Sequence, residues 1–359
     1  MKAVSHPQSA IRSGARTICA LVLFLAFSST AAAQSASSAA GGAAGGPAFR
    51  EVVDETGRRV RVPVAVRRIV SLARNLTQTV YAQGAQDRLV GVTDYCDYPP
   101  DALSKPKVGG PLNPSLEQVV ALRPDLVLVA RTANRRETLE ALERLGIATY
   151  ATNPQSVEGV LDSTLHVADL IGERERGEEL VASLRARLAN LKQRLAGRPP
   201  RRVLFVVWHE PLISVGRNTF LADALRWAGA ELAIETDAEW PRLNLEEIVH
   251  VQPEFLVFAS SHSEGVKQTV DDLRGRPGWR SLEAVRQGRI AVISDAVNRP
   301  APRLVDAIEQ LARQLHPAAF QQQRENGKGK MEKGTSATSQ GHFPFPNFRF
   351  PFRGARCSR

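Results

Sequence analysis

The chain has 359 residues, of which 43% are hydrophobic and 23% charged, a balance typical of globular proteins with a sizeable core. Its net charge of +10 comes almost entirely from the ends, because residues 1–33 contribute +3 and residues 318–359 contribute +6. The nearly neutral remainder argues against a basic groove for nucleic acid. With only three cysteines, the composition also excludes a disulfide framework and a cysteine-type zinc site.

The N-terminus has the pattern of an export signal. Lys2, Arg12 and Arg16 precede an apolar run, and small residues follow as far as Ala33. The run is too short to span a bilayer as a helix with polar ends, which favours export over anchoring. We therefore expect a periplasmic protein whose signal peptide, residues 1–33, is cleaved after Ala33.

Short β-type runs alternate with amphipathic helical patterns along both halves of the chain. The runs are RRIVSL, RLVGVT, DLVLVA and IATYAT in the first half, and RVLFVV, LAIET, EFLVFA and RIAVIS in the second. This alternation predicts an α/β fold of two Rossmann-like lobes with largely parallel sheets. Ahead of the first lobe, an alternating segment around Thr56 and Gly57 predicts a β-hairpin.

A long helical pattern separates the two halves. Leucines recur at helical spacing from Leu180 to Leu195, and Gly197 is placed to end the helix before Pro199. One helix of residues 173–196 is therefore expected to connect the lobes. The predicted segments are a signal peptide, 1–33; an Ala/Gly/Ser-rich linker, 34–48; an N-terminal α/β lobe, 49–155; a helical region with the long interlobe helix, 156–198; a C-terminal α/β lobe, 199–317; and a disordered basic tail, 318–359.

One stretch of sequence occurs twice, 129 residues apart, as SLEQVVALRPDLVLVA and NLEEIVHVQPEFLVFA. Ser115 with Gln118, and Asn244 with Glu247, have the spacing of a capping box. Each copy is therefore expected to open a short helix that ends before its proline. The side chains predicted to share the apolar face of these helices are Leu116, Val119 and Val120 in the first copy and Leu245, Ile248 and Val249 in the second.

Each repeated helix also carries a glutamate in its first turn, Glu117 or Glu246, on a side where solvent is expected. A carboxylate there interacts favourably with the helix dipole, which by itself explains either residue. The two glutamates nevertheless occupy the same position in the two copies.

Two loops place an aromatic residue before a proline at the end of a strand. In VGVTDYCDYPP the residue is Tyr98, and in AIETDAEWPR it is Trp240. Ligands of α/β lobes bind beyond the carboxyl ends of the strands, so these loops are candidates for the facing walls of a cleft. An aromatic plug that caps the core of its own lobe is the alternative.

Polar residues follow other strands in the same way. Asp295 and Arg299 come after the last strand, and Arg74 follows the first strand of the first lobe. Arginine and carboxylate groups in such a place are available to a ligand. A solvated turn at Asp295 and a merely exposed Arg74 remain the alternatives.

No pattern in the chain indicates catalysis. Trp208 and His209 follow a predicted strand and are candidates for the cleft, and His209 is a weak candidate for a metal ligand. The sequence contains no G-x-S-x-G, no H-E-x-x-H and no phosphate-binding glycine loop, which favours binding over an enzyme. An exported metal-binding protein or enzyme that uses His209 and Glu210 is the alternative. Cys96 and Cys357 are interpreted as free thiols, with a disulfide between them as the other reading.

These motifs, in this order from about residue 49 to residue 316, resemble the periplasmic substrate-binding proteins of cobalamin, haem and iron-siderophore ABC importers, and most of all the cobalamin-binding members. The resemblance is carried by RIVSL, GAQDRLVGVTDYCDYPPDA, KVGGPLNPSLEQVVALRPDLVLV, the interlobe helix and EWPRLNLEEIVHVQPEFLVF with SDAVNRPAPR. It implies two lobes bridged by a rigid helix, with the ligand held between them and only small hinge motion. It also implies a monomer that acts without a cofactor and without nucleic acid.

By the positions of the motifs, the resemblance implies that Glu117 and Glu246 dock on arginines of the permease dimer in the inner membrane. It implies a corrinoid ligand, cobalamin or cobinamide, with haem or a ferric siderophore as the alternative. The residues that match ligand-contacting positions of the cobalamin-binding members are Tyr95, Trp240 and Asp295, and Arg299 matches an arginine of the same loop. The chain departs from that pattern at Pro111 and Ala296, where those members have tryptophans.

Overall fold

The computed structural model describes residues 48–259 and 272–321. The predicted signal peptide, nearly all of the linker and most of the tail, with Cys357, lie outside the described residues. Within the described part of the chain, no helix has both the length and the apolar character needed to cross a bilayer.

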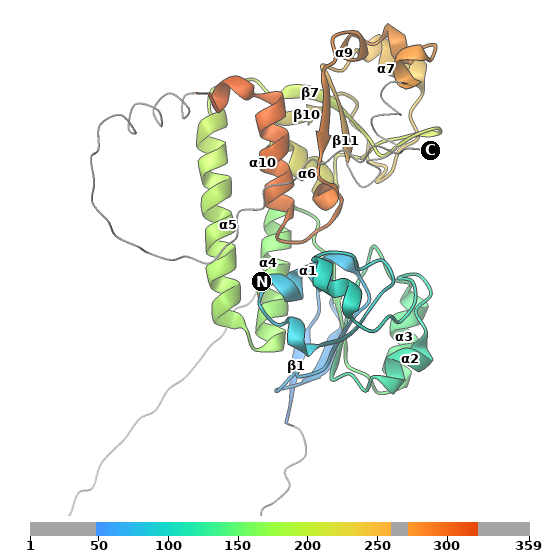
Figure 1. Ribbon diagram of the computed structural model, residues 1–359, viewed down its shortest axis with the longest axis vertical. Helices are drawn as coiled ribbons and strands as arrows, with labels where there is room; N and C mark the ends of the chain where they lie inside the picture. Colours follow the sequence, from blue (N-terminus) through green and yellow to red (C-terminus); the bar gives the residue numbers. More distant parts are fainter. Residues whose placement is uncertain (1–47, 260–271, 322–359) are drawn as a thin grey trace, which may run out of the picture. The chain divides into compact units, whose positions relative to one another are not determined.

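The N-terminal lobe is built on a 4-stranded parallel sheet with the order β4-β3-β5-β6 (Figure 1). Its strands are β3 (Ile69–Ser71), β4 (Leu89–Val92), β5 (Leu126–Ala130) and β6 (Thr149–Thr152). Its helices are α1 (Arg74–Ala82), η1 (Gln86–Arg88), η2 (Pro100–Ser104), α2 (Leu116–Ala121) and α3 (Arg136–Arg144). The predicted hairpin is confirmed, since β1 (Phe49–Val53) pairs antiparallel with β2 (Arg59–Pro63).

The C-terminal lobe contains a second 4-stranded parallel sheet, with the order β10-β7-β11-β12. Its strands are β7 (Arg201–Val206), β10 (Ala230–Leu232), β11 (Phe255–Ala259) and β12 (Ile290–Ile293), and a separate two-stranded hairpin is formed by β8 (Trp208–His209) and β9 (Leu212–Ile213). Its described helices are α6 (Phe220–Trp227), α7 (Leu245–Val251), η4 (Trp279–Ser281), α9 (Glu283–Arg286), η5 (Asp295–Asn298), α10 (Leu304–Leu315) and η6 (Pro317–Ala319).

The two sheets share one topology. In each, the first strand lies between the second and the third, and the fourth follows the third at the edge. This confirms the predicted pair of parallel α/β lobes and explains the repeated sequence, which occupies the same helix and third strand in both. The strand predicted at LAIET lies two residues earlier, because β10 pairs with β7 up to Leu232 and the chain leaves the sheet edge after Ala233, whose N donates to Val203 O at 2.8 Å.

The central strand of each sheet is buried on both faces. In β5, alternate side chains point into two separate apolar clusters, one toward α1 and α4 (Val157–Ile171) and one toward α2 and α3. β11 is divided in the same way between a cluster that includes α6 and α10 and another beneath α7 and α9. A run of consecutive apolar residues is therefore required in both strands, as it is in parallel sheets generally.

The long helix α5 (Arg174–Leu195) contacts both lobes, as predicted (Figure 1). Near its start, Glu173 pairs with Arg88 of the N-terminal lobe, and further along, Arg187 pairs with Asp306 of α10 in the C-terminal lobe at 2.6 Å. Leu184, Leu188 and Leu191 are buried. A helix of 22 residues is about 33 Å long at 1.5 Å per residue, so it acts as a stiff spacer.

The structure adds a second helix, α4, which packs along α5 and was not predicted as part of the bridge. Its first residue is tied to the C-terminal lobe, where Val157 N donates to Asp223 at 2.8 Å, and its middle is tied to the N-terminal lobe, where Gln83 donates to Thr164 O at 2.6 Å. Two packed helices resist bending more than one does, so the lobes are connected rigidly. The φ of +73° at Gly197, two residues after the end of α5, is the left-handed conformation expected of a helix stop.

The predicted tail begins at residue 318, and the structure describes its first residues, 318–321. Phe320 packs against the core of the C-terminal lobe, and the guanidinium groups of Arg194 and Arg313 lie over its ring at 5.8 and 5.5 Å. Composition alone assigned Phe320 to the tail, because one aromatic residue in a polar segment has no periodicity that reveals a packing partner.

Candidate functional site

The repeated segments form matching helices at matching places. Ser115 caps α2 by accepting from Gln118 N at 3.2 Å, as predicted. Asn244 caps α7 by accepting from Glu246 N at 3.0 Å instead of the predicted Glu247 N. Val120 is 42% exposed, so its predicted place on the buried face is wrong, because α2 lies at the lobe surface and buries chiefly Val119.

The match extends to the end of each helix. Arg123 and Gln252, at equivalent positions before the proline, both have positive φ, 44° and 48°. In each lobe an arginine of the first strand or its approach donates to a carbonyl of the last helical turn, Arg68 to Leu122 O at 2.7 Å and Arg202 to Val251 O at 3.3 Å. The helices are thus held at both ends by equivalent interactions.

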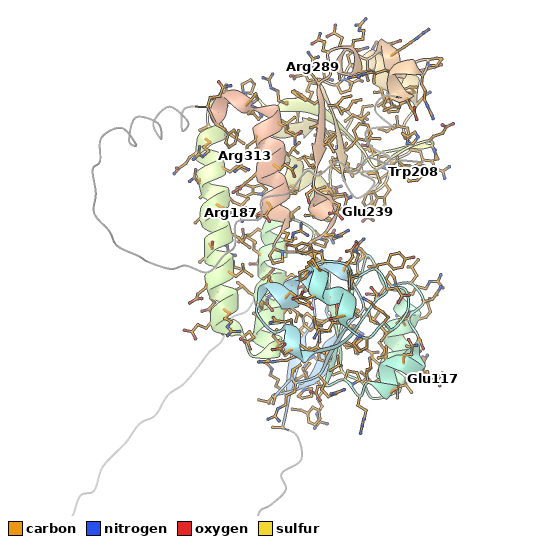
Figure 2. The ribbon with its side chains drawn as sticks, in the orientation of Figure 1. Glu117, Arg187, Trp208, Glu239, Arg289 and Arg313 are labelled. Atoms are coloured by element: carbon orange, nitrogen blue, oxygen red, sulfur yellow. The ribbon has the colours of Figure 1, made fainter. Side chains whose placement is uncertain are left out.

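The two glutamates are exposed in the first turn of α2 and of α7, as predicted. No interaction with another described side chain occupies either carboxylate, and Figure 2 shows Glu117 at the periphery of the N-terminal lobe. Two free carboxylates in equivalent places, on lobes joined by a stiff bridge, can engage two equivalent surfaces of one partner.

A cavity of about 290 Å³ lies between the lobes, where the carboxyl ends of strands from both sheets meet. It is lined by Ala73, Arg74, Asn75, Thr93, Pro111, Ala130, Thr132, Ala133, Thr152, Pro154, Gln155, Thr219, Phe220, Glu239, Trp240, Asn298, Arg299 and Pro300. Asn75 also donates across the lobes to Pro300 O at 3.4 Å. The cavity therefore lies at the end of both sheets where α/β lobes generally bind their ligands.

Two arginines of the cavity wall are already paired. Arg74 of the N-terminal lobe donates to Asp97, and Arg299 of the C-terminal lobe donates to Asp295. Burial raises the pKa of Asp97, but the hydrogen bond and charge of Arg74 outweigh that effect, so the pKa lies below its ordinary value. Burial lowers the pKa of Arg299, which is only 8% exposed, and the charge of Asp295 offsets part of this shift. The charge of each arginine is thus balanced by an aspartate of its own lobe.

The predicted aromatic residues are placed differently from one another. Trp240 lines the cavity and is 49% exposed. Tyr98 lies beside the cavity, with the guanidinium of Arg303 from the other lobe 3.4 Å from its ring centroid. Tyr95 is 59% exposed and does not line the cavity. Its ring lies beside Gly110, and the next residue, Pro111, does line the cavity.

Trp208 also lies outside the cavity lining. It sits on the β8–β9 hairpin at the outer end of the C-terminal lobe, where Figure 2 shows it, and its ring stacks on His209 with centroids 6.1 Å apart. Among the described residues, no three His, Cys, Asp or Glu side chains lie close enough together to hold a metal ion, and His209 belongs to no such group. Cys96 is buried and free, with its sulfur 3.1 Å from the hydroxyl of Thr77.

The two positions that depart from the resembled pattern have different surroundings. Pro111 lines the cavity, so the tryptophan that it replaces would have added an aromatic wall there. Ala296 is 1% exposed and packs in the core of the C-terminal lobe. Only the change at Pro111 therefore alters the surface of the cavity.

Several lining residues were not predicted. Thr93, Thr132 and Thr152 come at or just after the carboxyl ends of β4, β5 and β6, a signal that the strand pattern contained. Glu239 stands before Trp240 as Asp97 stands before Tyr98, so the duplication also pointed to it. Thr219 and Gln155 have no such signal, because only the approach of the second lobe brings them to the cavity.

A larger hollow of about 630 Å³ lies along α5 and α10, where Figure 2 shows Arg187 and Arg313. Both arginines are bonded to Glu309, at 3.1 and 3.3 Å, and Arg187 also to Asp306. Burial raises the pKa of Glu309, but Arg187 and Arg313 lower it further than that. These charges are satisfied by one another, which is the pattern of a structural network.

The chain belongs to the periplasmic binding protein family, whose sequence pattern matches residues 69–297. It is a periplasmic binding protein of an ABC importer, and the relatives that it matches are substrate-binding proteins.

A vitamin B12-binding protein of Vibrio cholerae is 27% identical over 265 residues, which are 72% of this chain and 92% of that protein. An uncharacterised ABC transporter substrate-binding lipoprotein of Bacillus subtilis is 28% identical and covers 75% of this chain and 86% of its own length.

Solved structures of two ligand classes are similar to this chain. The periplasmic vitamin B12-binding protein of Vibrio cholerae superposes with a TM-score of 0.61 at 25% identity, covering 72% of this chain and 99% of its own. A periplasmic heme-binding protein of Roseiflexus gives a TM-score of 0.63 at 29% identity, covering 71% of this chain and 100% of its own. The fold is thus common to vitamin B12 and heme binders, and the similarity alone does not choose between them.

Proposed function

We propose that this chain carries a corrinoid, cobalamin or cobinamide, to an ABC importer, holding it between its two lobes. The observation that carries the proposal is the charge of the cavity wall, where Arg74 and Arg299 are already neutralised by Asp97 and Asp295. The other polar side chains of the wall are hydroxyl and amide groups, apart from Glu239. Such a lining suits the neutral amides around a corrin ring better than the carboxylates of haem or of many siderophores.

The axial ligands that the metal requires also favour a corrinoid over haem. Haem iron in proteins is held by an axial His, Met, Cys or Tyr, whereas the cobalt of cobalamin carries its own axial ligands. None of these four residue types occurs among the described residues that line the cavity, so an axial ligand to haem iron would have to come from outside the lining, as from Tyr98 or Tyr95. The vitamin B12-binding relatives at 27–28% identity support the corrinoid class.

Aromatic side chains would extend the binding surface beyond the cavity itself. At about 290 Å³, it is at the lower end of the size of small-molecule pockets, roughly 300–1,000 Å³, so a macrocycle would extend beyond it. The rings of Trp240, Tyr98 and Tyr95 would then cover the protruding faces of the macrocycle, while Asp295 and Arg299 would engage its amides or nucleotide tail.

Export and docking complete the proposed cycle. Residues 1–33 would direct the chain to the periplasm and be cleaved after Ala33, and the chain would act as a monomer. Glu117 and Glu246 would pair with arginines of the two permease subunits in the inner membrane. The relatives, periplasmic proteins and a lipoprotein, are consistent with a site outside the cytoplasmic membrane.

The test is a titration of the purified protein with cyanocobalamin, dicyanocobinamide and haemin, followed by tryptophan fluorescence and by calorimetry. We expect saturable one-to-one binding of a corrinoid and at least tenfold weaker binding of haemin. Tight haemin binding with no response to either corrinoid would contradict the proposal.

Haem is the second candidate, because heme-binding structures are as similar to this chain as the vitamin B12-binding one. In that case Arg74 and Arg299 would exchange Asp97 and Asp295 for the ligand's carboxylates. A new absorption band of bound haemin, lost on Tyr98→Phe or Tyr95→Phe, would identify a phenolate ligand to the iron and support this candidate.

A further inference from the structure

Glu239 has a distinctive place in the cavity. It is the one acidic residue among the described residues that line it, and no cationic side chain of residues 48–259 or 272–321 lies within ion-pair distance of its carboxylate. Figure 2 shows Glu239 at the edge of the C-terminal lobe that faces the N-terminal lobe. The neighbouring acids on the same loop differ, because Asp237 is bonded to Arg217 at 2.8 Å and Glu235 lies 3.9 Å from the same arginine.

The backbone that carries Glu239 is firmly held. Glu239 O accepts from Gly216 N at 3.0 Å, and the residues on either side are held by Arg217 N to Thr236 O and Ser214 N to Pro241 O, both also 3.0 Å. A Cβ at Gly216 would come within 1.9 Å of Ala238 O, so only glycine permits this close approach. Glu239, whose side chain is exposed, is therefore presented at the cavity wall by a fixed loop.

The charge of Glu239 is not cancelled by the rest of the wall. Arg74 and Arg299 are each bonded to an aspartate, so each pair is close to neutral as a ligand approaches. An unpaired carboxylate on a cavity wall repels a ligand carboxylate and accepts hydrogen bonds from amide N–H groups or a cation.

We propose that Glu239 is a specificity-determining residue that makes the cavity select its ligand by charge. The cavity accepts chelates whose periphery at the Glu239 wall is amide or cationic, and it disfavours chelates with a carboxylate there. This inference rests on the proposed function, because it takes the cavity between the lobes to be the ligand site. It goes further in naming the residue and the chemical property that is selected.

The test uses ligands that differ by one charge. Cyanocobalamin is compared with its monocarboxylate derivatives, in which one peripheral propionamide has been hydrolysed, on the wild-type protein and on Glu239→Gln. Glu239→Gln keeps the shape of the side chain and removes only its charge. The control is Glu231→Gln, which removes an exposed carboxylate of the same lobe that neither lines the cavity nor forms an ion pair.

We expect the wild type to bind at least one monocarboxylate roughly tenfold more weakly than cyanocobalamin, as two like charges a few ångströms apart in a partly solvated site would require. Glu239→Gln should reduce that ratio to within about twofold, whereas Glu231→Gln should leave it unchanged. The ratio in the wild type should also shrink in high salt, because the charges are accessible to ions. An unchanged ratio in Glu239→Gln would overturn the proposal.

Failure of the proposed function gives a different result. If the wild type ignores corrinoids and binds haemin, the corrinoid assignment fails and the role of Glu239 is tested on haemin instead. Glu239→Gln should then bind this dicarboxylate roughly tenfold more tightly than Glu231→Gln does. Equal haemin affinities in the two variants would overturn the role of Glu239 as well.

Discussion

At the scale of single residues, Asp54 shows how one buried carboxylate joins the N-terminal hairpin to the sheet. Its side chain accepts hydrogen bonds from Thr56 Oγ1 at 2.7 Å, Arg58 Nη2 at 2.6 Å and Ala151 N of β6 at 3.3 Å. Burial raises the pKa of Asp54, but the hydrogen bonds from Thr56 and Arg58 lower it further, so the carboxylate stays ionised. The buried charge is tolerated because both carboxylate oxygens accept hydrogen bonds.

We predict that Asp54→Ala lowers the free energy of unfolding by about 2–4 kcal/mol, since it removes the acceptor of Thr56, of Ala151 N and of Arg58 Nε, although Arg58 keeps its bonds to Glu143 and Thr149 O. Urea denaturation followed by circular dichroism measures this change. The control is Glu51→Ala on the same hairpin, whose pair with Arg59 is exposed at 60% and 80%. Its effect should stay below about 0.5 kcal/mol. Equal losses in the two variants would contradict this account of Asp54.

The same carboxylate predicts a pH dependence. Its pKa in the folded state lies below the ordinary value of 3.8, so its stabilising contribution is complete above that value and is lost as the pH falls through the folded-state pKa. The difference in unfolding free energy between wild type and Asp54→Ala should be constant from pH 7 to about 5 and should shrink below about pH 4. A difference that already shrinks between pH 7 and pH 5 would point to another titrating group.

At the scale of elements, α2 and α7 are equivalent helices that differ in the side-chain bonds of the residue before the proline. Arg123 and Gln252 both adopt the left-handed backbone conformation before a proline. The side chain of Gln252 compensates by donating to Val249 O at 2.7 Å and accepting from Glu283 N at 3.0 Å. The exposed side chain of Arg123 makes no such bond within the described part of the chain.

We therefore predict opposite effects of glycine at these two positions. Arg123→Gly should raise the free energy of unfolding by up to about 1 kcal/mol, because glycine relieves a left-handed conformation that costs other residues about 1–2 kcal/mol. Gln252→Gly should lower it by about 1 kcal/mol or more, because the lost hydrogen bonds outweigh the relieved strain. Thermal melts of both variants measure the signs, and a shared sign would show that the side chain of Gln252 does not matter.

At the scale of the whole chain, the two repeated helices present two glutamates at a separation that the fold sets. Glu117 and Glu246 stand on separate lobes that α4 and α5 connect rigidly, so their separation is set by the fold. A rigid pair of charges can meet a permease dimer without first losing conformational freedom.

We predict that the double variant Glu117→Arg, Glu246→Arg abolishes uptake of labelled cyanocobalamin when it replaces the wild-type chain in cells. Ligand affinity should stay within about threefold, because neither residue lines the cavity and both are exposed. The matched control is Glu137→Arg, Glu231→Arg, which reverses one exposed, unpaired glutamate in each lobe. Loss of ligand binding in the first double variant would mean that these helices serve the fold and not the docking.

The sequence by itself determined what depends on local periodicity. The apolar runs of β5 and β11, the leucine spacing of α5, and the capping residues and prolines that delimit α2 and α7 all act over a few residues, so they predicted the parallel lobes, the bridge and the exposed glutamates.

Only the tertiary structure decided which side chains meet between the lobes. Asp97 and Asp295 are the partners of Arg74 and Arg299, and Arg303 lies over Tyr98. Glu239 stands on the cavity wall with no cationic partner in the described part of the chain. These contacts join residues far apart in the chain, and no periodic pattern encodes them. They depend on how one lobe is held against the other, which the packing of α4 and α5 sets.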